Sequence, residues 1–250
     1  MRIVSAPSSS RTSESSLRDI VLEWEDVNSI VENGDLHKFY RLPSVLQTYL
    51  AHLKRIALEY SSARNYIMRQ VLHWNEDDLV GSPAQAIKLE GCAHDLDAEC
   101  EDGRGGWFEG EEADCSVQKT PFPYAVDTDI THYIVWSKRP LLHPCIVPKH
   151  FPPEVRLAAW RTIQTRGLSG SFPSRKSTPP SSTTMSSLLY EDAHEAQVRQ
   201  ALSESSRYLR SFIGSTWNEE EYEVAWFANP PSLQSLPTLA HWHCMVRRRQ

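Results

Sequence analysis

The feature that most constrains the fold is a two-residue alternation near the carboxyl end, within the stretch Glu223 to Arg247. Successive side chains of a strand point to opposite faces, so the alternation over residues 239–247 predicts a strand. Its apolar face, which is suited to pack on a core, consists of Ala240, Trp242, Cys244 and Val246. Its other face consists of Leu239, His241, His243 and Met245. The two imidazoles on that face lie about 6.6–7 Å apart along the backbone, which is close enough to act together.

Two more stretches are predicted to join this strand in one sheet. Residues 223–228 form a strand that must end at Asn229-Pro230-Pro231, because proline has no N–H to donate to a ladder. Residues 130–136 carry apolar side chains on both faces, which is typical of a central strand covered on both sides. His132 would then be a half-buried polar group that needs a hydrogen-bond partner.

Apolar side chains that recur every three or four residues predict helices over residues 44–73, 154–165 and 191–213. We therefore predict an α+β fold, in which these helices pack on a mainly antiparallel sheet. The globular part is expected to be a single domain that spans residues 17–247, because a chain of this length can bury one sizeable core.

Three segments have compositions that disfavour a packed core. Residues 1–16 are rich in serine and poor in apolar side chains, so we expect them to be disordered. Residues 92–118 are rich in Asp and Glu, and residues 167–187 consist largely of Ser, Thr and Pro. We expect both to be disordered insertions in the domain.

Charge and hydropathy exclude several classes of partner. The net charge of −6 and the pI of about 5.9 give no basic field that would recruit nucleic acid. No run of apolar residues is long enough to cross a membrane, and the first residues lack the apolar core of a secretory signal. Five cysteines at irregular spacings favour reduced thiols. We therefore expect a cytoplasmic protein without nucleic-acid or membrane partners; the sequence does not identify its protein partners.

Three blocks, residues 41–74, 121–138 and 223–246, contain most of the patterned sequence. Their most specific marks are Trp136, Trp226-Phe227, Asn229-Pro230, Gln234-Ser235 and His241-x-His243. Together the blocks resemble the fungal family named after an N-acetylglucosamine-induced protein, which is a domain of unknown function. The resemblance implies a fungal, cytoplasmic protein that is linked to the N-acetylglucosamine response or to amino-sugar metabolism.

The last block also resembles the histidine-triad (HIT-like) fold of nucleotide hydrolases and transferases. In that fold an asparagine, a Gln-Ser loop and alternate histidines surround an α-phosphate. The matching positions are Asn229, Gln234, Ser235, His241 and His243. This resemblance implies a ligand that is a nucleotide or a phosphorylated sugar.

The chemistry of these residue types fits such a ligand. A neutral imidazole can attack phosphorus and form a covalent phosphoramidate, and a second imidazole can fix its tautomer or stabilise charge. Uncharged polar groups can position phosphate oxygens. The candidates for contacting the substrate are Asn229, Gln234, Ser235 and His132. The candidates for supplying positive charge are Lys138, Arg139 and Arg247.

The triad needs three alternate histidines, and this strand has two. In one register, His243 is the nucleophile, His241 is the first histidine and Met245 replaces the third. In the other register, His241 is the nucleophile and Leu239 replaces the first histidine. We favour the first register, because the apolar positions that follow His243 suit it.

Two other interpretations of the histidine pair stay open. Alternate histidines on a strand can chelate zinc, with His132 as a third ligand, but no Asp or Glu lies close in the sequence to complete the site. We therefore expect no metal and no cofactor. The pair can also be structural, in a non-catalytic regulatory or interaction protein of amino-sugar metabolism. The sequence does not decide between an enzyme and a binding protein.

Overall fold

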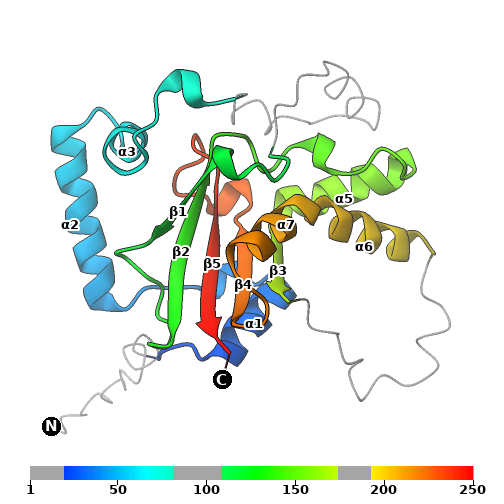
Figure 1. The fold of residues 1–250 in the computed structure, drawn as a ribbon, viewed down its shortest axis with the longest axis horizontal. Coiled ribbons are helices and arrows are strands. Elements are labelled where there is room, and N and C mark those ends of the chain that lie inside the picture. The colour runs from blue at the N-terminus through cyan, green and yellow to red at the C-terminus, as the bar shows by residue number, and fades with distance from the viewer. Residues whose placement is uncertain (1–19, 81–107, 174–192, 250) are drawn as a thin grey trace, which may run out of the picture.

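The computed structural model describes residues 20–80, 108–173 and 193–249 of the chain. These residues form one five-stranded sheet in which every pair of neighbouring strands is antiparallel, in the order β1-β2-β5-β4-β3 (Figure 1). The strands are β1 (Cys115–Lys119), β2 (Ile130–Ser137), β3 (Leu168–Phe172), β4 (Tyr222–Ala228) and β5 (His241–Arg248). The strand that carries the histidine pair, β5, is thus the central strand of the sheet.

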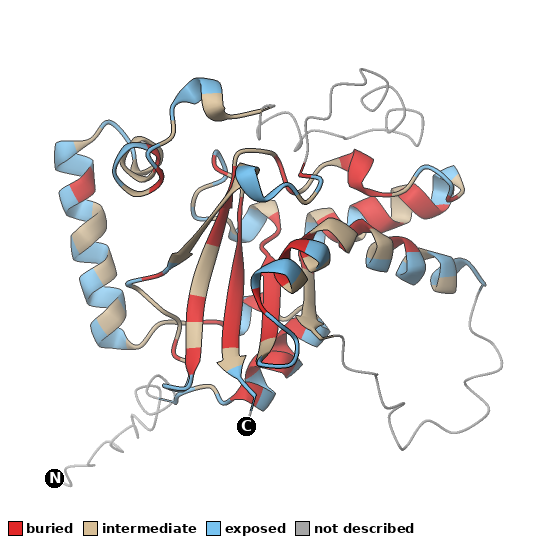
Figure 2. Ribbon diagram, viewed as in Figure 1, coloured by how far each residue is buried: buried red, intermediate tan, exposed pale blue. Residues whose placement is uncertain are grey.

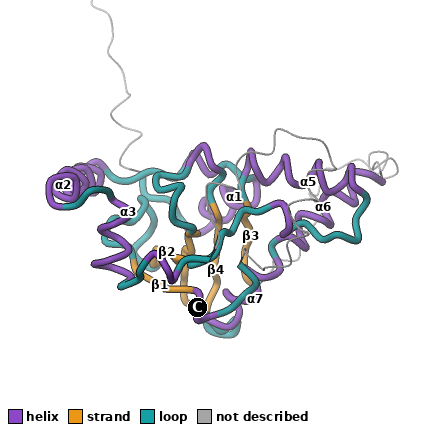
Figure 3. The backbone as a smooth tube through the Cα atoms, turned by 90° about the horizontal axis from the view of Figure 1, so that it is seen from above, coloured by secondary structure: helices purple, strands orange, loops and turns teal. Residues whose placement is uncertain are grey.

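Six α-helices lie in the described part of the chain. They are α1 (Trp24–Asn33), α2 (Pro43–Glu59), α3 (Ala63–Tyr66), α5 (Pro153–Arg166), α6 (Ala193–Ser205) and α7 (Arg207–Thr216). Helices α2 and α3 lie beyond the β1 edge of the sheet, whereas α5 and α6 lie beyond the β3 edge (Figures 1 and 3). The predicted α+β fold with an antiparallel sheet is therefore confirmed.

Both faces of the central strands are covered. The largest core lies between one face of the sheet and helices α5, α6 and α7, and its biggest side chains include Trp160, Trp226 and Trp242. Helix α1 packs on the opposite face against Phe227 and Met245. The turn at residues 67–72, a short π-helix, covers that same opposite face around Trp136 and Leu239. Cover on both faces explains why nearly all of β5 is buried.

The alternation predicted for β5 is confirmed, but the face that carries the two histidines is covered by other elements. Trp242 and Cys244 lie in the large core, and His241 and His243 share the other face. The strand begins at His241, two residues later than predicted. The histidine face is not open to solvent, because α1, the turn at residues 67–72 and the loop before β2 lie over it.

Two strands lie inside the ranges expected to be disordered insertions. Residues 115–119 form β1, and residues 168–172 form β3. Both are edge strands with half-buried side chains, so they need little apolar content and resemble loops in composition. Within β3, Gly170 lies opposite Trp226, where a side chain would collide with the indole. The rest of the two expected insertions, apart from residues 108–114, 167 and 173, lies outside the described residues, as does the segment 1–16.

The long predicted helices are divided in the structure. The range 44–73 becomes α2, α3 and the π turn, with Ser62 capping α3 through a 3.1 Å bond from the backbone N–H of Asn65. The range 191–213 becomes α6 and α7, which meet at Ser206; residues 191 and 192 lie outside the described part. Helix α5 agrees with its predicted bounds to one residue.

Helix α2 packs less than its apolar stripe predicts. Ile56 is its only buried residue, while Leu46 and Leu50 are 42% and 48% exposed. Most of the α2 ribbon is accordingly coloured exposed or intermediate (Figure 2). Among the described residues, no helix has the length and apolar character needed to cross a membrane. The expectation of reduced thiols holds for Cys115 and Cys244 but is wrong for Cys145, which is disulfide-bonded.

The contact of β3 with the indole of Trp226 gives a test of the packing. A Cβ at position 170 would lie 2.9 Å from the ring of Trp226, which is 1% exposed. We expect Gly170→Ala to lower the free energy of unfolding by about 1–3 kcal/mol, as overpacked cores do. Urea unfolding measures this change. Ser171→Ala on the same strand is the control, and an equal loss in both variants would contradict this packing.

Candidate functional site

Three histidines meet on one face of the sheet. His132 lies on β2, and His241 and His243 lie on β5, which pairs with β2 so that His243 is opposite Ile134. The side chain of His132 reaches diagonally across to His243, and its Nε2 lies 3.0 Å from Nδ1 of that residue. The partner that His132 was expected to need is therefore the histidine of the neighbouring strand.

Burial keeps all three imidazoles neutral. Desolvation and, to a smaller extent, the positive charge of Arg41 lower the pKa of His132 to about 3. The pKa of His243 is held well below its ordinary value by burial and then by the nearby His132, His241 and Arg41. Burial also lowers the pKa of His241, and a backbone hydrogen bond opposes part of that shift. Each ring therefore carries a single N–H at neutral pH.

The hydrogen bonds then decide which nitrogen holds that proton in two of the rings. The backbone N–H of Tyr124 donates to Nδ1 of His132 over 3.3 Å, so the proton of His132 lies on Nε2. This Nε2–H donates to Nδ1 of His243. The proton of His243 must therefore lie on its own Nε2, which has no hydrogen-bond partner among the described residues.

The third ring has the opposite tautomer. Nδ1 of His241 lies 2.8 Å from the carbonyl oxygen of Leu239, which can only accept, so Nδ1 carries the proton. Nε2 of His241 keeps its lone pair, and no described residue donates to it. The two β5 histidines therefore differ: His241 presents a lone pair, as a nucleophile or base requires, and His243 presents an N–H donor.

Aromatic rings enclose the histidines. Tyr124 stacks on His132 at 4.8 Å, Phe227 stacks on His243 at 4.8 Å, and Trp136 lies 4.9 Å from His241. The exposed fractions of His132, His243 and His241 are 2%, 5% and 8%. All three rings are therefore enclosed, and His243 does not face an open hollow.

His241 alone among the three lines a cavity. The cavity has a volume of about 270 Å³ and lies at the end of the sheet where the β4–β5 connection, α5 and the loop after β2 meet. Its polar lining residues are Gln164, Ser232, Gln234 and His241, and its walls include Trp160, whose indole N–H is buried and has no partner among the described residues. No charged residue lines it within the described part of the chain.

The other residues predicted to contact a substrate are only partly brought together. Gln234 lines the cavity with His241, and its Nε2 donates over 2.8 Å to the backbone carbonyl of Asn229. Asn229 itself is buried and Ser235 is exposed, and neither is a lining residue. The favoured register, with His243 as the nucleophile, therefore agrees less well with the structure than the register with His241.

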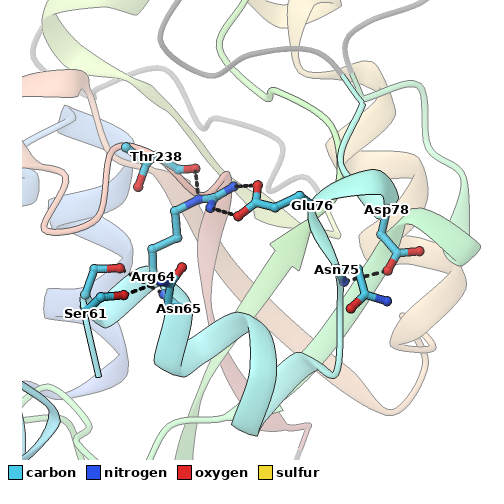
Figure 4. A network of polar contacts seen from close by, with 8 residues as sticks. Ser61, Arg64, Asn65, Asn75, Glu76, Asp78 and Thr238 are labelled. Carbon is cyan, nitrogen blue, oxygen red and sulfur yellow. Dashed lines mark hydrogen bonds and ion pairs between the residues drawn. The ribbon is translucent and has the colours of Figure 1, made fainter. Parts of the chain in front are cut away.

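The connection that carries Gln234 is tied to the helical side of the molecule. Arg64 of α3 donates from Nε to the carbonyl oxygen of Thr238 over 3.3 Å (Figure 4). Its guanidinium also forms a two-pronged ion pair with Glu76, one arm of which measures 2.7 Å. This contact fixes the chain immediately before Leu239, whose carbonyl in turn sets the tautomer of His241.

The predicted sources of positive charge do not face the histidines. Arg139 pairs with Asp114, Arg247 pairs with Glu223 at 2.7 Å, and Lys138 lies over the ring of Trp74. The sequence interpretation missed a different cation, Arg41. Its guanidinium is stacked between Tyr49 and Tyr124, 4.5 and 5.0 Å from the two ring centroids. No local pattern could have found it, because it precedes α2 and lies 81 residues from Phe122 and 202 residues from His243 in the sequence.

The geometry does not match a metal centre. In the described ranges, no group of three or more His, Cys, Asp or Glu side chains is arranged to hold a metal ion. The nitrogens of His132 and His243 that would face a shared ion are instead hydrogen-bonded to each other.

Fold and site together define an α+β protein with a buried, neutral histidine network beside a small cavity. A family model described as "Protein of unknown function (DUF3605)" matches residues 23–145 and 185–247, and the chain belongs to this family. The uncharacterized protein YPL067C of Saccharomyces cerevisiae (strain ATCC 204508 / S288c) is 22% identical over 226 residues, covering 90% of this chain and 78% of that protein.

A solved structure described as "Crystal Structure of HTC1" covers 90% of this chain and 84% of its own, with 20% identity and a TM-score of 0.43. A likeness at that TM-score carries no argument about fold or function. The comparisons thus place the chain, with a fungal relative, in a domain family of unknown function.

The depressed pKa of His132 predicts instability in acid. Below pH 6.5 the unfolded chain binds a proton at His132 that the folded chain excludes. The free energy of unfolding therefore falls by about 1.4 kcal/mol for each pH unit below 6.5, which amounts to about 2 kcal/mol at pH 5. Urea unfolding at pH 7.5 and pH 5 measures this loss. In His132→Gln, which keeps a donor to His243 but does not titrate, we expect the loss to be smaller by that amount. An identical loss in both proteins would show that His132 is not buried in its neutral form.

Proposed function

We propose that the chain binds a phosphate ester in the 270 Å³ cavity and transfers or hydrolyses its phosphoryl group, with His241 as the nucleophile. The observation that carries this proposal is the hydrogen bond from Nδ1 of His241 to the carbonyl of Leu239. It leaves the lone pair of Nε2 free on a neutral ring, which is the form that attacks phosphorus. His243 does not line the cavity; its ring lies 5.6 Å from that of His241, edge to face, and holds the nucleophile in position.

Water is the only co-reactant that this reaction needs. Attack by Nε2 of His241 forms the N–P bond and breaks the P–O bond, and the departing alkoxide takes a proton from water. Hydroxide or water then cleaves the N–P bond, which releases phosphate and restores the neutral imidazole. Gln234 and Gln164 supply amide groups that position uncharged or weakly charged parts of the ligand.

The resemblances suggest which esters to test. The order of an asparagine, a Gln-Ser pair and alternate strand histidines supports a HIT-like phosphotransfer site, although only Gln234 and His241 line the cavity. The resemblance to the N-acetylglucosamine-induced family favours a phosphorylated amino sugar or its nucleotide in a cytoplasmic setting. The volume of the cavity suits one monomeric ligand, since sites for drug-sized molecules start at about 300 Å³.

A second candidate function is supported by the burial of the network. His132 and His243 are almost fully enclosed, and no charged side chain of the described residues lines the cavity. These observations favour a non-catalytic protein, which binds either a small ligand or a protein partner in amino-sugar metabolism. The histidines would then have a structural role and stabilise the sheet. This candidate predicts the same ligand contacts at Gln234 but no reaction at His241.

A turnover assay separates the two candidates. The full chain is incubated with amino-sugar phosphates, sugar nucleotides and adenylates, and the released products are quantified. We expect His241→Gln to lose at least about 10³-fold in kcat, as nucleophile variants do. We expect His243→Leu, which fills the same space behind His241, to lose far less than His241→Gln, because His243 does not line the cavity. Exposed His37→Gln is the control for substitution of a histidine as such.

The covalent intermediate gives the second readout of this assay. Rapid quenching in base should trap an acid-labile phosphate on His241 in the wild type and none in His241→Gln. Equal residual turnover in the wild type and His241→Gln would mark a contaminant and reject the enzyme. Saturable binding without turnover would support the second candidate, a protein that binds its ligand but does not react with it.

A further inference from the structure

A second cavity lies at the opposite edge of the sheet from β1. It has a volume of about 520 Å³ and is bounded by the carboxyl ends of α1 and α5, by β3, and by the bend between α6 and α7. It shares no lining residue with the cavity beside His241. Nothing in the proposed phosphoryl transfer uses it.

The cavity runs along the edge of β3 rather than over one face. Five consecutive residues, 167–171, line it, whereas a cavity on one face of a strand would touch alternate residues. Because β3 is the last strand of the sheet, one row of its backbone N–H and C=O groups does not bond within the sheet. The cavity therefore has backbone donors along one wall.

Two guanidinium groups flank this wall. Arg210 donates from its terminal nitrogen to the carbonyl oxygen of Ser203 over 2.8 Å, which holds its charged head at the cavity wall. Arg166, at the last position of α5, lines the cavity and has no hydrogen bond or ion pair among the described residues. Arginine forks of this kind bind phosphate and carboxylate oxygens in pairs.

The acids nearby do not neutralise both arginines. Among the described residues, Glu32 is the one acid that lines the cavity, and it is exposed. Asp35 is close enough for Arg166 to lower the pKa of its carboxyl slightly, but the main cause of that shift is its 2.6 Å bond to Lys38. At least one positive charge therefore remains for a ligand.

The floor of the cavity contains an unused donor. The indole of Trp226 lines the cavity, is 1% exposed, and has an N–H that is buried without a partner among the described residues. Gly170 makes room for this ring, because a Cβ there would lie 3.2 Å from the indole nitrogen. A buried donor without a partner costs free energy, which a ligand oxygen would recover.

We propose that this groove along β3 binds a phosphate monoester, with the phosphate between Arg166 and Arg210. The donors on its walls are the two guanidiniums, the Trp226 indole and the hydroxyl of Ser203, all suited to oxygen acceptors that carry negative charge. The site is independent of the reaction at His241, so the chain has two places for phosphate chemistry: one that reacts and one that only binds.

Calorimetric titration of the full chain tests the proposal. The titrations use His241→Gln as the background, so that binding at the first cavity is not mistaken for binding at the second. The ligands are inorganic phosphate and O-phosphoserine, with unphosphorylated serine as the comparison. We expect millimolar or tighter binding of a phosphate ligand, and a loss of at least about 10-fold in affinity when Arg166→Gln is added, as for one charge-assisted hydrogen bond.

The matched control is Arg161→Gln, an exposed arginine on the same helix that does not line the cavity. Arg210→Lys, which keeps the charge but not the fork, should also weaken binding. Preference for O-phosphoserine over inorganic phosphate would indicate a phosphorylated ester as the ligand, and equal affinity would indicate free phosphate; both support the site. Absence of binding by either ligand, or an equal loss in Arg161→Gln, overturns it. Failure of turnover at His241 would leave this result unaffected.

Discussion

The hydrogen bond between His132 and His243 is the interaction on which the character of the site depends. It joins side chains of two neighbouring strands inside a region where an unpaired polar group would cost about 1–3 kcal/mol. Because the backbone N–H of Tyr124 fixes the tautomer of His132, the tautomer of His243 follows from it. The tautomer of His241 is fixed separately, by the carbonyl of Leu239. A residue without a donor at position 132 would leave the proton on His243 undetermined.

The second property of the site is that its three imidazoles are neutral. Aromatic rings stack on the imidazoles and remove water from them, which penalises the charged form and keeps a lone pair available at neutral pH. The same enclosure limits access, so only His241, at the first position of β5, reaches a cavity. Burial in the sheet thus keeps the histidines neutral, whereas only a histidine at the end of a strand is accessible to a ligand.

Much of the fold could be predicted from the sequence, because alternation and helical periodicity are local. The strand of His241 and His243 and its apolar Trp242 face are correct for that reason. Edge strands β1 and β3 could not be found, since their stability comes from backbone pairing rather than from side chains. The site was predicted in part. Residue spacing shows that two imidazoles share a face, but it does not show whether another layer, here brought by Arg41 and Tyr124, covers that face.

The assignment of protons within the network is the central claim, and ring-nitrogen NMR of the full chain with ¹⁵N-labelled histidine tests it most directly. At pH 7 the account predicts His241 protonated at Nδ1, His132 and His243 protonated at Nε2, and none of the three as imidazolium. Site assignment would come from single His→Gln variants. A His241 ring protonated at Nε2, or a charged ring at any of the three positions, would contradict the account.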